Sequence, residues 1–203
     1  QIGFFERIKR LWSKQYAKST FMMWVLWFTV VFSYYGMFLW LPSVMTGKGF
    51  DLITSFKYVL IMTLAQLPGY FTAAYFIEKF GRKFVLITYL IGTAISAYFF
   101  GAAESVAMLL AFGMLLSFFN LGAWGALYAY SPEQYPGEVR ATGTGMAAGI
   151  GRVGGILGPL LVGTLLTKGF DYSYIFAIFC GAILVGVLAV ALLGKETKQT
   201  ELQ

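Results

Sequence analysis

The chain has 203 residues, of which 59% are hydrophobic and 12% are charged, and its formal net charge is +6. A soluble domain carries about 25% charged residues, so this composition excludes a soluble domain. The cations lie scattered between apolar runs, which argues against a nucleic-acid partner. The single cysteine, Cys180, excludes a disulfide within the chain, and the lack of histidine excludes a His-ligated metal site or proton relay.

The first 19 residues are the longest polar segment. Apolar residues recur there at spacings of three and four with basic residues between them: Ile2, Phe5, Ile8, Leu11, Trp12 and Tyr16. This pattern predicts a short amphipathic helix over residues 1–19 on the cytoplasmic face. It would serve as an interfacial anchor, as a linker from a preceding domain, or as both.

Six long apolar runs follow, and each is long enough to cross about 30 Å of hydrocarbon. They are Thr20–Met45, Ile53–Ile77, Phe84–Gly101, Val106–Tyr130, Ala141–Thr167 and Tyr174–Leu193. All are expected to be helical, because lipid offers no partners for an open sheet edge. The predicted fold class is therefore an all-α membrane protein, with a six-transmembrane-helix bundle over residues 20–193 and a cytoplasmic tail over 194–203.

The distribution of cations predicts the orientation of this multi-pass protein in the cell membrane. With the N-terminus inside, eleven Lys and Arg residues are cytoplasmic and three are external, and Arg152 is the last of the 15. This bias follows the positive-inside rule and places both termini in the cytoplasm. All nine acids lie at or beyond helix ends, so no carboxylate is expected within the membrane to carry a coupling proton.

The loop between the second and third runs reads Glu78-Lys79-Phe80-Gly81-Arg82-Lys83. Gly81 permits a tight reversal with positive φ. Glu78 is an acid at a helix C-terminus, where the helix dipole disfavours it, so we expect it to have a cationic partner.

The loop between the fourth and fifth runs contains Pro132 and Pro136, which end one helix and shape the connection. Glu133, Glu138 and Arg140 can form ion pairs there. Exposed pairs contribute only about 0–1 kcal/mol, so these pairs are expected to form and break as a latch.

Together these segments resemble the C-terminal half of the major facilitator superfamily. The first loop is similar to the family's acid-basic-x-Gly-basic-basic signature, and the second to the Pro-Glu-x-x-Pro-x-x-x-Arg-x-x-Gly pattern of its sugar-porter-like, metabolite:proton symporter branch. The tail Gly194-Lys195-Glu196-Thr197-Lys198 is similar to that branch's ending, with Lys195 in place of proline. Ala74 replaces the glycine usual four residues before the loop acid.

A narrower resemblance is to bacterial niacin-permease-like and aromatic-acid transporters. The segments that carry it are 27–42, which contains Ser33-Tyr34-Tyr35-Gly36 and Trp40-Leu41-Pro42, then Gln66-Leu67-Pro68-Gly69-Tyr70, and Gly122-Ala123-Trp124-Gly125.

The superfamily resemblance implies one six-helix bundle that rocks against another around a midplane site. The second bundle would be an N-terminal half or a second copy of the chain. Helices 1 and 4 would line the cavity, 2 and 5 would face the other half, and 3 and 6 would face lipid. The implied cytoplasmic gate consists of Glu78 and Arg140, assisted by Arg82 and Glu133.

The fifth run is rich in glycine, and several pairs have small-xxx-small spacing: Gly145/Gly149, Gly151/Gly155 and Gly154/Gly158. Such pairs allow close approach of backbones. Tight packing inside the bundle and a sliding interface between halves both explain them.

Arg152 lies 12 residues beyond Arg140, which is about 18 Å along a helix and close to the midplane. Other polar or aromatic residues at this level form, with Arg152, the candidate substrate site: Tyr34, Tyr35, Gln66, Asn120 and Trp124. On the fourth run, residues 117, 120, 124 and 128 share one face.

An arginine fork binds a carboxylate through two hydrogen bonds, and aromatic rings stack on a planar ring. The predicted substrate is a small organic anion, such as the aromatic carboxylate nicotinate. Alternatively, backbone carbonyls or an acid of the other half satisfy Arg152, and the rings only pack.

The leading functional hypothesis is secondary active transport with proton symport, the coupling carboxylate coming from the other half. A sugar-porter-like carrier of neutral polyols would use Gln66 and Asn120. A membrane scaffold or sensor that transports nothing is the third alternative. No enzyme, metal or cofactor is expected, because no nucleophile, base and orienting group occur together.

Overall fold

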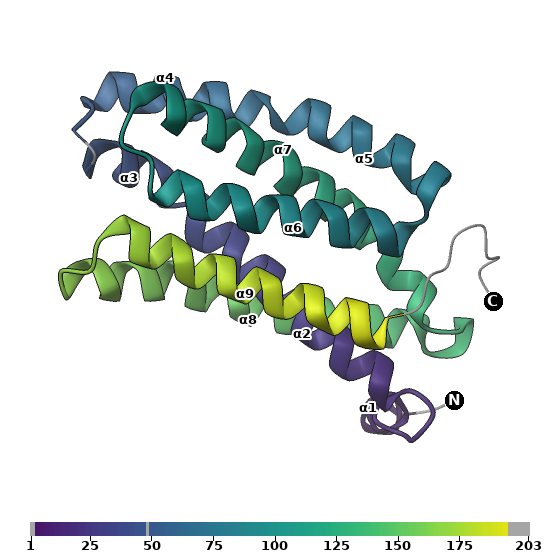
Figure 1. Cartoon of the computed structure of the whole chain (residues 1–203). Helices are drawn as coiled ribbons and strands as arrows, with labels where there is room; N and C mark the ends of the chain where they lie inside the picture. The colour runs from purple at the N-terminus through teal and green to yellow at the C-terminus, as the bar shows by residue number, and fades with distance from the viewer. Residues whose placement is uncertain (1–2, 48, 195–203) are drawn as a thin grey trace.

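The computed structural model describes residues 3–47 and 49–194, except for the side chains of Phe4 and Glu138. The tail motif beyond Gly194, the start of the segment at Ile2 and the expected pairing of Glu138 therefore lie outside the described residues. Within the described part the chain is helical (Figure 1). Its elements are α1 (Phe4–Leu11), α2 (Ala17–Phe38), α3 (Leu41–Gly47), α4 (Leu52–Leu64), α5 (Gln66–Phe80), α6 (Arg82–Gly101), α7 (Val106–Tyr130), the 3-10 turn η1 (Ser131–Gln134), α8 (Gly137–Thr167) and α9 (Tyr172–Leu193).

Six helical spans in this part of the chain are long and apolar enough to cross a membrane, which confirms the predicted bundle. Two of the predicted runs are not single helices. The first was expected to continue to Met45, but α2 ends at Phe38 and α3 begins anew at Leu41. Pro42 explains this break, because it cannot donate a backbone hydrogen bond to the carbonyl of Phe38.

The second span divides at Ala65, whose N–H bonds to the carbonyl of Met62 in a tighter turn. Pro68 has no N–H for the carbonyl of Leu64, so the regular pattern fails at this point. The division places Gln66 at the first position of α5, within the membrane-spanning segment Leu52–Phe80.

Two groups of helices make up the bundle. The helix α2 packs against α8 and α9, while α7 packs against α5 and α6, and contacts between α6 and α9 join the groups. The spans of α4–α5 and α8 are the least covered, since 22% of the residues in their apolar 18-residue stretch are buried, against 56% in α2 and α6. The second and fifth spans therefore have the largest uncovered faces.

The glycines of α8 fall into two sets. A methyl group on Gly154 would lie 2.6 Å from the carbonyl oxygen of Phe28, and one on Gly158 would collide with the carbonyl of Phe32, so both are packed against α2. Gly145 and Gly149 have no described atom within 4 Å of such a methyl group. The spacing thus reflects packing inside the bundle at one set and an open face at the other.

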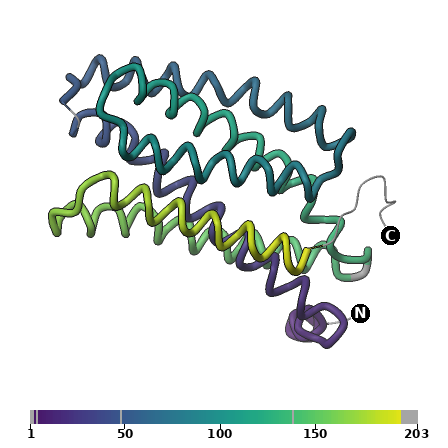
Figure 2. The backbone as a smooth tube through the Cα atoms, viewed as in Figure 1, coloured from purple at the N-terminus to yellow at the C-terminus, as the bar shows by residue number. Residues whose placement is uncertain are grey.

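The segment before the first span is shorter than predicted. Its helix α1 ends at Leu11, and α2 already begins at Ala17. Leu11 is fully buried, its carbonyl accepts a hydrogen bond from Thr20 Oγ1, and the ring of Trp12 meets that of Trp24 edge to face. Figure 2 shows α1 nearly end-on, so it crosses the direction of the long helices at the end of the bundle that holds the α5–α6 and α7–α8 loops.

Candidate functional site

Four of the predicted site residues form one cluster of side chains, which come from α2, α5 and α7. The rings of Tyr34 and Trp124 pack edge to face with centroids 5.4 Å apart, and Tyr34 packs in the same way on Tyr35 at 5.2 Å. The Gln66 side chain interacts with the Tyr34 hydroxyl. Tyr34, Gln66 and Trp124 are half-buried and Tyr35 is 40% exposed, so this cluster borders an open face of the bundle.

Arg152 lies on that open face of α8. Its side chain is exposed, and no described residue forms an ion pair or hydrogen bond with it. Gly155, less than one helical turn further along, packs beside Tyr35, since a methyl group there would lie 3.0 Å from the Tyr35 ring. Arg152 therefore lies on a flank of α8 next to the face that packs on Tyr35, and no described backbone carbonyl satisfies its side chain.

Asn120 lies apart from this open face. Its side chain is 3% exposed, and its Oδ1 has no hydrogen-bond donor among the described residues. The Trp124 Nε1 donor, one turn away, has no acceptor among the described residues. Buried polar atoms are usually satisfied, so these two atoms mark a place where a polar partner is missing.

The predicted shared face of α7 is covered unevenly. Ser117 and Asn120 are buried, Trp124 is half-buried and Tyr128 is 61% exposed. Periodicity gave their common direction correctly, but the neighbouring helices decide which of them a solute can reach.

Trp27 was not among the predicted site residues, yet it belongs to the cluster. Its ring packs edge to face on Trp124, with centroids 6.3 Å apart, and on Tyr128 at 5.5 Å. Trp27 precedes Tyr34 by two helical turns, and this spacing is the signal that could have identified it.

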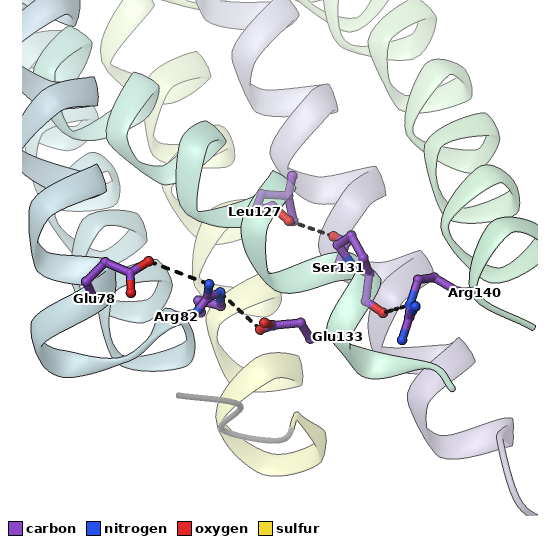
Figure 3. Close-up of polar contacts among 7 residues, drawn as sticks. Glu78, Arg82, Leu127, Ser131, Glu133 and Arg140 are labelled. Atoms are coloured by element: carbon purple, nitrogen blue, oxygen red, sulfur yellow. Dashed lines mark hydrogen bonds and ion pairs between the residues drawn. The ribbon is translucent and has the colours of Figure 1, made fainter. Parts of the chain in front are cut away.

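The predicted gate residues form a network at one end of the bundle (Figure 3). Gly81 has φ of 99°, as the reversal requires, and it sets α6 beside the end of α5. Arg82 then pairs with Glu78 at 3.7 Å and with Glu133 at 3.1 Å. The expectation that Glu78 needs a cationic partner is confirmed.

The ion pairs of Glu133, Glu138 and Arg140 were expected to be exposed, and for Glu133 this expectation is wrong. The side chain of Glu133 is 8% exposed and that of Arg82 is 20% exposed, whereas Glu78 is 75% exposed. The turn η1 folds Glu133 inward against α6, so the Arg82–Glu133 pair is a largely desolvated contact. Arg140 donates from Nε to the carbonyl of Pro132 at 2.9 Å, which ties α8 to η1.

Within the described residues, no group of three or more His, Cys, Asp or Glu side chains could hold a metal ion. What the residues do provide is an exposed cation at mid-span, an aromatic cluster beside it, and a charge network at the loop end. Six apolar helices of this length define a polytopic membrane protein.

The comparison with known families agrees with this class. Residues 58–203 match the sequence model of the Major Facilitator Superfamily, and the chain belongs to that family. It is 65% identical over 198 residues to the "Putative niacin/nicotinamide transporter NiaP" of Bacillus subtilis (strain 168), covering 98% of this chain and 50% of that relative.

Two Acinetobacter baylyi proteins are further relatives. The "Niacin transporter NiaP" is 47% identical over 96% of this chain and 44% of its own length. The "Benzoate transport protein" is 30% identical over 93% of this chain and 41% of its own length. The chain thus spans about half the length of the curated relatives it matches.

Among solved structures, the fold is similar to a crystal structure of the Major Facilitator Superfamily transporter FucP in the outward conformation. The TM-score is 0.82 at 14% sequence identity, over 95% of this chain and 46% of that one. This likeness concerns the fold alone.

Proposed function

We propose that the chain forms one half of a secondary transporter for nicotinate or a similarly small aromatic carboxylate. It would work by alternating access against a second six-helix bundle. The half-length match to its relatives and the uncovered faces of α5 and α8 support a second bundle as the partner.

The observation that carries the proposal is Arg152, which is exposed at mid-span, has no partner among the described residues, and lies three residues before Gly155, the glycine that packs on Tyr35. A charge at mid-span costs several kcal/mol in lipid, so it is expected to face a water-filled cavity or a partner. A carboxylate offers two oxygens to the arginine fork. A pyridine or benzene ring would then lie against Tyr34, Tyr35 and Trp124, whose rings prefer edge-to-face and offset contacts.

The names of the three relatives support the same substrate class, because two concern niacin and one concerns benzoate. Nicotinate and benzoate share a carboxylate on a planar six-membered ring. A neutral polyol would leave the Arg152 charge without a counterion, which makes the polyol carrier the weaker alternative.

Orientation and coupling belong to the same proposal. The cation distribution supports both termini in the cytoplasm and residence in the cell membrane. The acids of the described spans lie at their ends, as do Glu78 and Glu133, so a coupling proton would be carried by a carboxylate of the second bundle.

The direct test is uptake of labelled nicotinate into vesicles that contain the assembled transporter, with and without an inward proton gradient. We expect saturable uptake that benzoate inhibits and that nicotinamide and a hexose inhibit weakly. Faster uptake with the gradient supports symport. Inhibition by the hexose but not by benzoate would favour the polyol carrier, and absence of uptake of all of these would favour a scaffold or sensor.

A further inference from the structure

We infer that Ser131 is a positioning residue that couples the aromatic cluster to the cytoplasmic charge network. Trp27 and Ser131 form the connection, and the inference rests on the proposed function, since the coupled event is substrate binding beside Trp27 and Trp124.

The connection begins at Trp27 with two buried hydrogen bonds. Trp27 Nε1 donates to Ser131 Oγ at 2.9 Å, and Ser131 Oγ donates to the carbonyl of Leu127 at 2.7 Å. Trp27 is 5% exposed and Ser131 is 2% exposed. An indole N–H has no other role than donation, so the hydroxyl of Ser131 is held with its proton toward Leu127 and its lone pair toward Trp27.

The next two residues of η1 extend the connection to the charge network. The carbonyl of Pro132 accepts the bond from Arg140 Nε, and Glu133 holds Arg82 (Figure 3). Three consecutive residues of η1 therefore contact three different helices: α2 through Trp27, α8 through Arg140 and α6 through Arg82.

This arrangement makes the turn a rigid connector. A 3-10 turn that contains proline has little freedom to absorb a displacement. When a ring inserts between Tyr34 and Trp124, the Trp27 indole, which packs on Trp124, must adjust its tilt. The Trp27–Ser131 bond transmits that adjustment to Glu133 and Arg140, and so biases the two arrangements of the charge network.

The test measures opening of the cytoplasmic end by the labelling rate of one cysteine. Gly145 is a suitable position, because a side chain there meets no described atom within 4 Å. The assembled transporter carries Gly145→Cys and Cys180→Ala in a background without other cysteines. Labelling by a water-soluble maleimide is compared without nicotinate and at saturating nicotinate, so that a change in affinity alone does not alter the result.

In the parent, we expect nicotinate to change the labelling rate by about fivefold or more, which is an ordinary coupling magnitude. Ser131→Ala and Trp27→Phe should each abolish most of this response, and the double variant should resemble either single variant. Ser131→Thr keeps the hydroxyl and should retain the response. Ser55→Ala removes a buried serine that contacts Thr46 at the opposite end of the bundle, and it should behave like the parent.

The outcomes distinguish the proposed function from the proposed coupling through Ser131. A parent that neither binds nicotinate nor changes its labelling overturns the proposed function and the coupling with it. A responsive parent whose Ser131→Ala and Trp27→Phe variants respond equally overturns the coupling alone. If Ser131→Ala does not fold, Trp27→Phe decides the question, because it removes the N–H and leaves the serine in place.

Discussion

The rings of Tyr34 and Trp124 meet edge to face at 5.4 Å and join the first membrane span to the fourth. The two residues lie far apart in the sequence, and their long side chains connect α2 to α7. Around it lie Tyr35, Trp27 and Gln66, with the guanidinium of Arg152 on the adjoining flank of α8. This contact is the centre of the proposed substrate site.

Truncation of Trp124 tests whether its ring contributes to the proposed substrate site. Trp124→Ala removes a ring face worth about 0.5–1.5 kcal/mol beyond its buried area, so the Kd for nicotinate should rise by about 3- to 10-fold or more. Phe170→Ala is the control, because Phe170 stacks on Tyr174 just outside the last span. Equilibrium binding of labelled nicotinate checks both variants, and an unchanged Kd for Trp124→Ala would remove the ring from the site.

The two acids that pair with Arg82 should contribute differently to the free energy of unfolding. Glu133→Gln removes the closer and more buried charged partner of Arg82, which keeps only the exposed Glu78, and should cost about 2–4 kcal/mol of stability. Glu78→Gln removes an exposed partner and should cost about 0–1 kcal/mol. Denaturant unfolding of the two variants side by side measures the difference, and equal losses would contradict the burial of the Glu133 contact.

Two glycines of α8 provide a matched test of the packing. Gly154→Ala forces a methyl group against the carbonyl of Phe28 and should destabilise the bundle by about 1–3 kcal/mol. Gly149→Ala enters open space and should stabilise the helix by about 0.5–1 kcal/mol. Unfolding midpoints in detergent compare them, and a larger loss from Gly149→Ala would show that this face is covered.

How far the sequence could predict this molecule depends on how local each feature is. The six spans, the reversal at Gly81 and the partner of Glu78 follow from runs, φ preferences and helix dipoles, and all three were predicted. The burial of Glu133 depends on which helix packs against which, and periodicity carries no such information. The division of the second span at Ala65 was not predicted, although Pro68 is a local signal for it.

The same limit applies to the candidate site. Spacing placed Asn120 and Tyr128 on one face, yet the former is 3% and the latter 61% exposed. Trp27 escaped prediction because its hydrogen bond to Ser131 joins segments far apart in the sequence. Spacing assigns residues to one face of a helix, but their access to solute depends on the neighbouring helices.

Alkaline pH should weaken the contact between η1 and the start of α2. Tyr135 donates to Thr20 Oγ1 at 3.0 Å, and burial raises the pKa of its hydroxyl above the usual 10.0. Because the folded pKa is above the unfolded one, the stabilisation is complete below about pH 10 and is lost as pH rises through the folded value. Tyr135→Phe lacks this titration and loses about 0.5–1.5 kcal/mol at neutral pH.

Thermal unfolding between pH 8 and pH 11 compares Tyr135→Phe with the parent. The stability gap between them should narrow above about pH 10. A gap that stays constant over the whole range would show that the Tyr135 hydroxyl does not titrate with folding.

The most direct measurement of the central claim is the nicotinate Kd of three forms of the assembled transporter: the parent, Arg152→Lys and Arg152→Ala. Hydrogen bonds to a charged group contribute about 1.5–3 kcal/mol, so Arg152→Ala should weaken binding by about 10- to 150-fold. Arg152→Lys keeps the charge without the fork and should lie between the two. A Kd that is the same in all three forms would contradict the role of Arg152 as the carboxylate anchor.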